Sequence, residues 1–395
     1  MKNFIKSENL TSCKNLTNTK SGGILTIDLD ALVENYHILT NQLNGTKPSA
    51  VVKADGYGLG AVPIALSLIN VGCSIFFVAN LEEGINLRDG LNESKIKEFT
   101  AIEIHILSGL IPNTENIYDA KNLIPVLGSI EEIYNWKTYC QKLNKALPCD
   151  IHVDTGMCRL GLPPKELAII EKEPSRIEDL NINLVISHLA CADEPNHEKN
   201  KEQLIAFNQA RKTLPKGRAS LANSSGIFLG PEYHFDLTRP GAALYGIEPI
   251  PGQTNPMKQV VRLQGRIAQI REVDTLQTVG YGGTYSVDRT AQIATVLVGY
   301  ADGYFRYLSS KGIGYIENFP VPVVGRVSMD LITIDISNVP KKLCPIGGLV
   351  DLIGPNNTVN KIAKDAGTIG YEILTNLGNR FHRYYKKDNQ PGNTS

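Results

Sequence analysis

The first 250 residues alternate short apolar runs with longer amphipathic stretches, and this rhythm constrains the fold more than any other feature. The amphipathic, helix-like stretches include residues 31–43, 59–71, 130–143 and 199–214. Such alternation is typical of parallel strands joined by crossover helices. The strand-like runs number eight: 49–54, 74–80, 103–107, 123–127, 149–154, 183–189, 218–223 and 233–237. Eight such units predict an α/β fold that closes into a (β/α)8 barrel of the TIM type.

The pattern changes after residue 250, where strand-like runs follow one another with few long helices between them. These runs are 259–273, 277–285, 291–300, 320–336 and 349–353. The Pro- and Gly-containing stretch 248–256 suits neither a helix nor a central strand, so it is the expected linker. We therefore predict a barrel over 23–250, a mainly β C-terminal domain over 251–385, and flexible tails at 1–22 and 386–395. The leading strand 25–30 is expected to be available for pairing with the C-terminal domain.

Composition favours a small-molecule partner. Hydrophobic residues make up 42% of the chain and charged residues 20%, as in ordinary globular proteins. Forty basic residues balance forty acidic ones, which argues against nucleic acid or an anionic membrane surface as a partner. The seven cysteines are odd in number and lack C-x-x-C spacing, so we expect reduced thiols, no metal site and a cytoplasmic location. Neither a secretory signal nor a membrane-spanning run is expected.

Polar residues stand at the ends of five of the predicted barrel strands. They are Lys53, Arg159, His188, Asn223 with Ser224, and Arg239. The carboxyl ends of barrel strands form one mouth, where active sites are built. A partly desolvated lysine there becomes nucleophilic enough to form a Schiff base with an aldehyde cofactor, and pyridoxal phosphate meets that need. Gly56, Gly58 and Gly60 would give a flexible turn whose following helix can present N–H groups to an anion.

Eight further segments accompany the lysine strand. The segment AVVKADGYG (50–58) resembles the cofactor-lysine signature of the alanine racemase family, in which a barrel is joined to a β domain. The likeness continues through DTGMCRLG (154–161), SHLACAD (187–193), ANSSG (222–226), LTRPGAALYG (237–246), GYGGTY (280–285), GYADGY (299–304), GRVSMD (325–330) and GYE (370–372). It covers essentially residues 24–385.

This resemblance implies a set of cofactor contacts. Lys53 would hold pyridoxal 5'-phosphate covalently as a Schiff base, with Arg239 at the pyridine nitrogen and His188 against the ring. Asn223 would belong to the same site. The residues implied in holding the phosphate are Tyr57, Ser224, Gly241, Ala242 and Tyr371.

The resemblance also implies the reaction, which is the interconversion of L- and D-alanine. Racemisation needs two proton-transferring groups on opposite faces, and the family places Lys53 on the D-alanine face and Tyr281 on the L-alanine face. A free tyrosine has a pKa of about 10, so Tyr281 would need nearby positive charge or hydrogen bonds. Arg159 and Met329 would contact the substrate carboxylate. The residues implied in the entry channel are Tyr300, Asp302, Arg306 and Arg326.

In this family the tyrosine that corresponds to Tyr281 reaches the barrel of the partner subunit, so the resemblance implies a head-to-tail homodimer with shared active sites. The resemblance also implies that the protein supplies D-alanine for peptidoglycan. One position departs from the family pattern. His152 stands where many members carry a carbamylated lysine that positions the arginine, so either a neutral His152 bonded to Arg159 or a bound anion would replace the carbamate.

Three alternatives remain open. A racemase of broader specificity, or one for serine or lysine, would share the whole pattern. A barrel-only cofactor carrier would lack Tyr281 and Met329. A decarboxylase of the same barrel type would be expected to use a cysteine at the active-site edge of its C-terminal domain, where this chain has only Cys344.

Overall fold

The computed structural model describes residues 20–94 and 101–387. This part of the chain divides into two compact units. The barrel unit consists of residues 33–244 and 248–257, and the β unit consists of residues 20–32, 245–247 and 258–387. The tails predicted at 1–22 and 386–395 lie largely outside the described residues, although Lys386 is the last residue of a strand.

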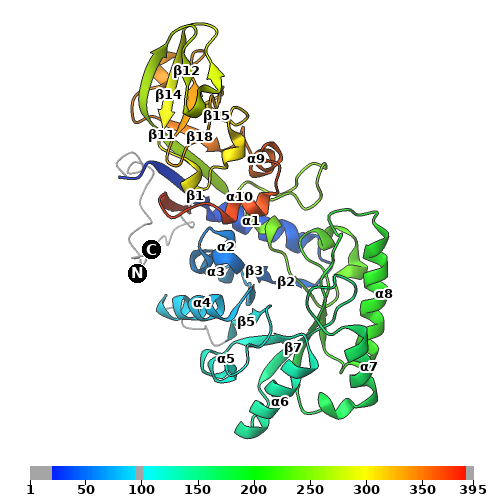
Figure 1. Ribbon diagram of the computed structural model, residues 1–395. Helices are drawn as coiled ribbons and strands as arrows, with labels where there is room; N and C mark the ends of the chain where they lie inside the picture. The colour runs from blue at the N-terminus through cyan, green and yellow to red at the C-terminus, as the bar shows by residue number, and fades with distance from the viewer. Residues whose placement is uncertain (1–19, 95–100, 388–395) are drawn as a thin grey trace, which may run out of the picture. The chain divides into compact units, whose positions relative to one another are not determined.

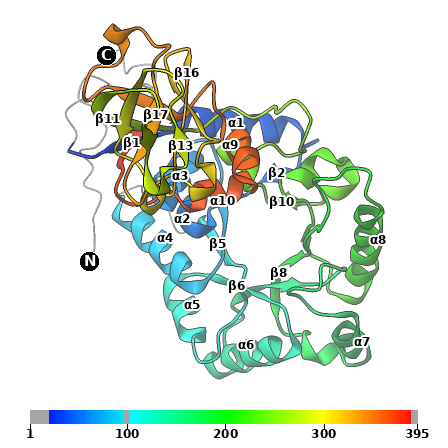
Figure 2. The same ribbon diagram turned by 45° about the horizontal axis from the view of Figure 1, so that its top comes forward.

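Seven parallel strands form the main sheet of the barrel unit, in the order in which they occur along the chain. Figure 2 shows helices α4 to α8 lying outside these strands as an outer layer. The strands are β3 (Ala50–Val51), β4 (Ile75–Val78), β5 (Glu103–Ile106), β6 (Ile124–Leu127), β7 (Pro148–His152), β8 (Asn181–Ile186) and β9 (Arg218–Ser220).

An eighth, very short strand closes this sheet. β10 (Leu237–Thr238) pairs in parallel with β2 (Lys47–Pro48). On one side of β10, Asp236 N donates to Ala219 O and Arg239 N to Ala222 O. On the other side, Ser49 N donates to Thr238 O and Val51 N to Pro240 O. The ladder therefore returns to its first strand, and the predicted (β/α)8 barrel is confirmed.

The strand predicted over 233–237 is wrong for most of its length. Residues Pro231–Tyr233 form a 3-10 turn instead, closed by the hydrogen bond from Tyr233 N to Gly230 O. Phe235 has a φ of 50°, a left-handed conformation that a strand cannot contain. The apolar run there reflects burial in a turn, which hydrophobic pattern alone does not distinguish from a strand.

The helices of the barrel unit agree closely with the predicted amphipathic stretches. The predicted helix 130–143 is confirmed at both ends: the Ser129 hydroxyl accepts a hydrogen bond from Glu132 N, and Asn144 ends the helix in a left-handed conformation. The helices are α1 (Leu29–Asn41), which begins in the β unit, α2 (Lys53–Tyr57), α3 (Ala61–Ile69), α4 (Leu81–Glu93), α5 (Glu115–Lys121), α6 (Ile130–Leu143), α7 (Pro164–Lys172) and α8 (Glu198–Thr213).

The β unit is built around one long strand, β11 (Val261–Val273), which pairs with β1, β14 and β18. The first described strand, β1 (Gly23–Asp28), labelled with β11 in Figure 1, lies antiparallel to β11 and parallel to β19. The others are β12 (Thr278–Val279), β13 (Tyr285–Ser286), β14 (Ala291–Val296), β15 (Ile313–Ile316), β16 (Phe319–Pro322), β17 (Ile332–Asp335), β18 (Leu349–Ile353) and β19 (His382–Lys386), with helices α9 (Val359–Ala366) and α10 (Gly370–Thr375).

The mainly β character predicted for the C-terminal region is confirmed, but two of its strands were not predicted. β15 and β19 are short and carry glycine, tyrosine or charged residues in place of a strong apolar alternation. Both are stabilised by distant partners, since β15 pairs with β16 and β18, and β19 pairs with β1. Tertiary pairing decides such strands more than local propensity does.

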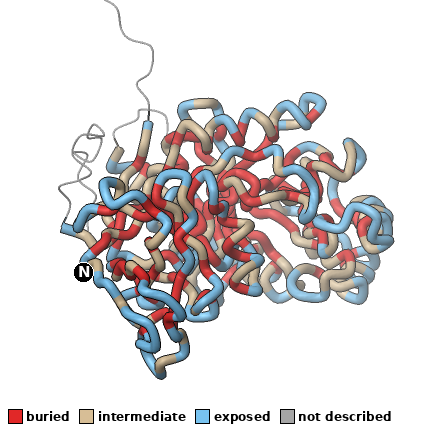
Figure 3. Tube along the Cα trace, turned by 90° about the horizontal axis from the view of Figure 1, so that it is seen from above, coloured by how far each residue is buried: buried red, intermediate tan, exposed pale blue. Residues whose placement is uncertain are grey.

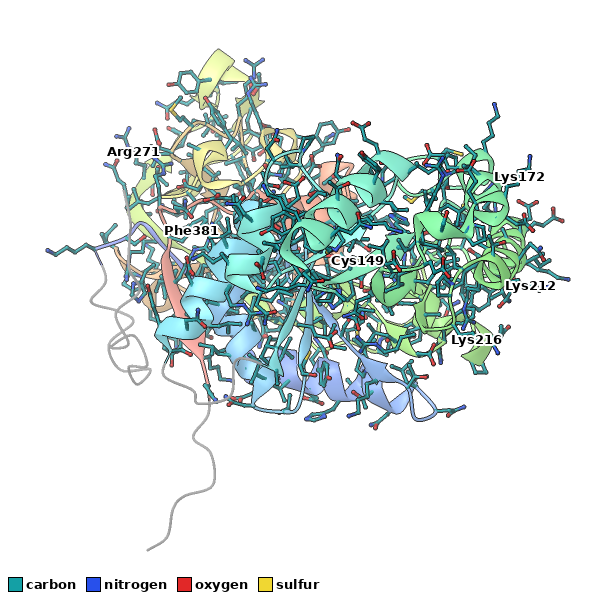
Figure 4. The ribbon with its side chains drawn as sticks, turned by 90° about the horizontal axis from the view of Figure 1, so that it is seen from below. Cys149, Lys172, Lys212, Lys216, Arg271 and Phe381 are labelled. Carbon is teal, nitrogen blue, oxygen red and sulfur yellow. The ribbon has the colours of Figure 1, made fainter. Side chains whose placement is uncertain are left out.

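Burial follows these layers. Buried residues, red in Figure 3, lie mainly in the interior, whereas exposed residues follow loops and outer helix faces. Figure 4 shows Cys149 among the barrel strands, and Lys172, Lys212 and Lys216 on the outer layer. Among the residues that the structure describes, no helix has both the length and the apolar character needed to cross a bilayer.

The barrel interior holds a buried ion pair that sequence analysis did not identify. His105 on β5 and Asp150 on β7 are fully buried, and their Nδ1 and Oδ2 atoms lie 2.5 Å apart. The other ring nitrogen of His105 lies 3.1 Å from Glu103, which also pairs with Arg218 at 2.8 Å. Burial alone would lower the pKa of His105, but the Asp150 and Glu103 carboxylates raise it to about 9. His105 is therefore a buried cation near neutral pH.

We expect His105→Gln to lower the free energy of unfolding by about 3–5 kcal/mol, because Asp150 would be left buried without its cation. Urea titration at pH 7 measures this loss. Since the pKa of His105 is raised, its contribution is complete below the ordinary histidine pKa and is lost as the pH rises through about 9. His37→Gln, at an exposed position of α1, is the control. Equal losses in the two variants would contradict a special role for the buried pair.

Candidate active site at the barrel mouth

Lys53 lies where β3 ends and α2 begins, at the carboxyl end of a barrel strand. Burial lowers the pKa of its amine, the positive charge of Arg159 lowers it further, and the negative charge of Glu83 opposes both. A lysine whose charged form is disfavoured offers a neutral, nucleophilic amine more readily. The environment of Lys53 therefore suits bond formation with a carbonyl group.

The turn that follows Lys53 has an unusual backbone. Ala54, Asp55, Gly56 and Tyr57 all have φ between 52° and 63°, so the chain makes a left-handed turn. Each of the three non-glycine residues costs about 1–2 kcal/mol in this conformation. The Asp55 carboxylate accepts a hydrogen bond from Ala61 N, at the start of α3. This hydrogen bond joins the turn to the first residue of α3.

Several basic side chains influence one another at this mouth. The pKa of His188 is held well below its ordinary value by burial and then by Arg239, Arg159, Lys53 and His152. Burial lowers the pKa of His152 to about 4, with Arg239 contributing in the same direction. Both imidazoles are therefore neutral near neutral pH. The charges of Lys53, Arg159 and Arg239 all act on His188, and this concentration of positive charge favours an anionic ligand.

Arg239 is buried and held by neutral oxygen atoms. Its guanidinium donates hydrogen bonds to Ser220 Oγ and Ser187 O, and a longer one of 3.4 Å to Leu221 O. Burial lowers the pKa of Arg239 to about 10, which still leaves it charged near neutral pH, and the charge of Asp150 opposes the shift. Arg239 is therefore a fixed cation and hydrogen-bond donor at the base of the mouth.

Next to Lys53, four predicted residues form a cradle of hydroxyl and backbone groups. Ser224 Oγ accepts hydrogen bonds from Gly241 N at 2.9 Å and Ala243 N at 3.2 Å, beside Ala242. A Cβ atom at residue 241 would collide with the Tyr57 hydroxyl, so a larger residue there would require the Tyr57 side chain to move. Asn223 Oδ1 accepts from Gly226 N and so stabilises the turn after Ser224. Tyr371, predicted to join this group, lies in the β unit at the start of α10.

A second group of predicted residues lies in the β unit. Tyr281 begins a short 3-10 turn, Tyr281–Gly283, and its side chain is 72% exposed. The guanidinium of Arg326 lies against this turn, since a Cβ atom at Gly282 would be 3.0 Å from Arg326 Nη1. A positive charge therefore lies beside the loop of Tyr281.

The loops that carry Tyr300 and Met329 are joined by backbone hydrogen bonds, from Tyr300 N to Ser328 O and from Ala301 N to Met329 O. Met329 is 53% exposed, and Arg306 is also exposed. Asp302 is buried, and its carboxylate accepts from Gly299 N and from Arg380 Nε. Arg380 donates as well to Asp330, so this arginine, which sequence analysis did not single out, links both loops.

His152 offers a test of this electrostatic description. Because its pKa is lowered in the folded chain, it contributes stability that is present above the ordinary histidine pKa and is lost as the pH falls toward 4. We expect the thermal midpoint of His152→Asn to fall less than that of the wild type between pH 7 and pH 4.5. His37→Asn, at an exposed position, should follow the wild type. The same fall in all three proteins would show that His152 titrates normally.

Comparisons with known proteins agree with this geometry. The family model described as the N-terminal domain of alanine racemase matches residues 27–249, and the one for the C-terminal domain matches residues 260–385. The chain is 47% identical to a catabolic alanine racemase of Mesorhizobium japonicum over 365 residues, which is 92% of this chain and 93% of the relative. It is 46% identical to an alanine racemase of Rhodospirillum rubrum over 367 residues, 93% of this chain and 96% of the relative.

Solved structures give the same result. The alanine racemase of Bartonella henselae with covalently bound pyridoxal phosphate superimposes with a TM-score of 0.87 at 41% identity, over 93% of this chain and all of the other. The biosynthetic alanine racemase of Pseudomonas aeruginosa gives 0.83 at 32% identity, over 93% of this chain and all of the other. Sequence, domain order and barrel site together show that this chain belongs to the alanine racemase family.

Proposed function

We propose that this protein is an isomerase that interconverts L- and D-alanine with pyridoxal 5'-phosphate as cofactor. The observation that carries the proposal is the conjunction of Lys53, with its lowered pKa, and a group of basic residues at the carboxyl ends of the barrel strands. Family membership over both domains supports the same reaction.

The residues present suit this cofactor. Pyridoxal phosphate is an anionic aldehyde, and the mouth combines a nucleophilic amine with concentrated positive charge. Lys53 would hold the aldehyde carbon, and Arg239 would donate to the pyridine nitrogen with His188 against the ring. Tyr57, Ser224, Gly241, Ala242 and Tyr371 would hold the phosphate. When bound, the cofactor withdraws electrons and makes the α-proton of the amino acid acidic.

The proton transfers are assigned to two side chains. The Lys53 amine removes the α-proton of D-alanine, and the Tyr281 hydroxyl group removes that of L-alanine from the opposite face. In each direction the other residue returns a proton. Arg159 and the backbone at Met329 bind the substrate carboxylate and so fix which bond faces each base. Tyr300, Asp302, Arg306 and Arg326 belong to the route by which substrate enters.

A head-to-tail homodimer is part of the proposal, with Tyr281 and Met329 completing the partner's barrel site. Its support is the exposure of aromatic and apolar side chains on turns, loops and the first turn of α10 in the β unit: Tyr281, Tyr300, Met329, Leu331 and Tyr371. Exposed apolar side chains mark interaction surfaces where they gather in one patch, and the loops of Tyr300 and Met329 are joined by hydrogen bonds.

Two physiological roles are compatible with the reaction. The first role is the supply of D-alanine for peptidoglycan. It would take place in the cytoplasm, which suits a protein whose described cysteines are free thiols. The second is breakdown of D-alanine as a nutrient, because relatives in Mesorhizobium japonicum and Agrobacterium fabrum are named catabolic alanine racemases. The chemistry at the site is the same in both.

We expect purified, cofactor-loaded protein to form D-alanine from L-alanine. Chiral chromatography measures the D-product, and L-serine and L-lysine are tested in parallel. Tyr281→Phe should lower kcat/KM by about 10²–10⁴-fold, the usual contribution of a general acid or base. Lys53→Ala should abolish turnover. Tyr285→Phe, in the neighbouring strand β13, is the matched control and should remain active. Faster turnover of serine or lysine would keep the mechanism and change the substrate, whereas no D-product would contradict the proposal.

Mixing the two inactive variants tests the shared site. In a heterodimer of Lys53→Ala and Tyr281→Phe subunits, one site carries both changes and the other carries neither. Random pairing should therefore restore about a quarter of the wild-type activity, as expected when each symmetric site takes residues from both subunits. If both residues of a site came from one subunit, every site would remain defective and mixing would restore nothing.

A further inference from the structure

The left-handed turn Ala54–Tyr57 fixes the backbone beside Lys53, yet its own residues disfavour that conformation. Internal hydrogen bonds close the turn, from Gly56 N to Val52 O and from Gly58 N to Ala54 O. Strained backbone of this kind persists only where surrounding structure determines it. The first residue of the turn, Ala54, therefore needs an acceptor from outside the turn.

Glu83 supplies that acceptor. It is the third residue of α4, and its Oε1 accepts a hydrogen bond from Ala54 N at 2.9 Å. Its Oε2 accepts from Ala79 N at 2.8 Å, directly after β4. One carboxylate thus joins the residue after Lys53 to the end of the neighbouring barrel strand.

Glu83 is itself held in place. The Asn80 side chain caps α4 and accepts a hydrogen bond from Glu83 N at 3.0 Å. The helix start therefore fixes the Glu83 backbone, and both carboxylate oxygens are occupied by N–H groups. Hydrogen bonds to an ionised acceptor are stronger than neutral ones, which suits an anchor for a strained turn.

The charge of Glu83 reaches Lys53 as well. Burial and Arg159 lower the pKa of the Lys53 amine, and Glu83 works in the opposite direction. The carboxylate is therefore close enough to influence the amine, in addition to holding the adjacent backbone.

We propose that Glu83 is a positioning residue, whose carboxylate holds the left-handed turn and thereby sets where the Lys53 amine meets its carbonyl partner. Glu83 touches neither substrate nor cofactor in this role and acts through the backbone of Ala54. The proposal rests on the proposed function only in taking pyridoxal phosphate as the carbonyl compound.

The Glu83→Gln variant tests this positioning role, because it removes the charge of residue 83 and hardly changes the size of the side chain. The amide keeps one acceptor oxygen but replaces the other with an N–H donor, so either Ala54 N or Ala79 N loses its partner. Cofactor-stripped protein would be mixed with pyridoxal phosphate, quenched with borohydride at intervals, and the label on the Lys53 peptide measured by mass spectrometry. We expect capture at Lys53 to slow about tenfold in Glu83→Gln, as for loss of one charge-assisted hydrogen bond. The matched control is Glu82→Gln, the exposed preceding residue of α4, which should capture at the wild-type rate.

Hydrogen exchange of the segment 53–60 gives a second readout that needs no cofactor. Exchange should quicken in Glu83→Gln and stay unchanged in Glu82→Gln, because only the first variant removes the anchor of the turn. Adding Ala54→Gly to Glu83→Gln removes the steric cost at Ala54 and should restore part of the capture rate and of the protection. This double variant also keeps the test informative if Glu83→Gln alone folds poorly.

The outcomes separate this proposal from the proposed function. Wild-type exchange of segment 53–60 in Glu83→Gln, or wild-type capture at Lys53, would overturn the role of Glu83. Slow capture and fast exchange in Glu83→Gln would support it, even if the wild-type protein formed no D-alanine. Failure of the wild-type protein to capture the cofactor at Lys53 would refute the proposed cofactor and, with it, the claim that Glu83 positions Lys53 for it.

Discussion

The hydrogen bonds that close the barrel determine where its reactive residues lie. Residues 236–240 bond on one side to the segment that precedes Ser224 and on the other to β3, which ends two residues before Lys53. Arg239 belongs to this closing segment, and Gly241 follows it. Lys53 is far along the chain from Ser224, Arg239 and Gly241, and this single ladder brings all four to one mouth.

The charge distribution inside the barrel changes along its strands. Within strands β5, β7 and β9, Glu103, His105, Asp150 and Arg218 form pairs in which carboxylates and cations balance. At the mouth, burial and then the charges of neighbouring basic residues lower the pKa values of His152 and His188. The paired charges in the barrel interior stabilise the fold, whereas the excess of positive charge at the mouth favours binding of a negatively charged ligand.

Much of the fold could be predicted because its signals are local. The periodicity of 130–143 and the Ser129 cap define α6 without reference to the rest of the chain. Strands such as β19, the buried pair of His105 with Asp150, and the contacts of Glu83 and Arg380 depend on residues distant in sequence. Residue type at each of these positions is compatible with an ordinary exposed or core role, so no local pattern identifies them. The strand predicted at 233–237 failed for the related reason that apolar turns and apolar strands have the same composition.

The position of β1 affects how the chain can be assembled during synthesis. This strand is made first, but its two neighbours are β11 and β19, which begin at residues 261 and 382. The whole barrel unit is therefore translated between β1 and its first partner. The edge of β1 that faces β11 has no native partner before residue 261 is made, and the edge that faces β19 has none before residue 382 is made. The β sheet therefore depends on pairing between strands far apart in the sequence, which is the kind of contact that forms slowly and late in folding.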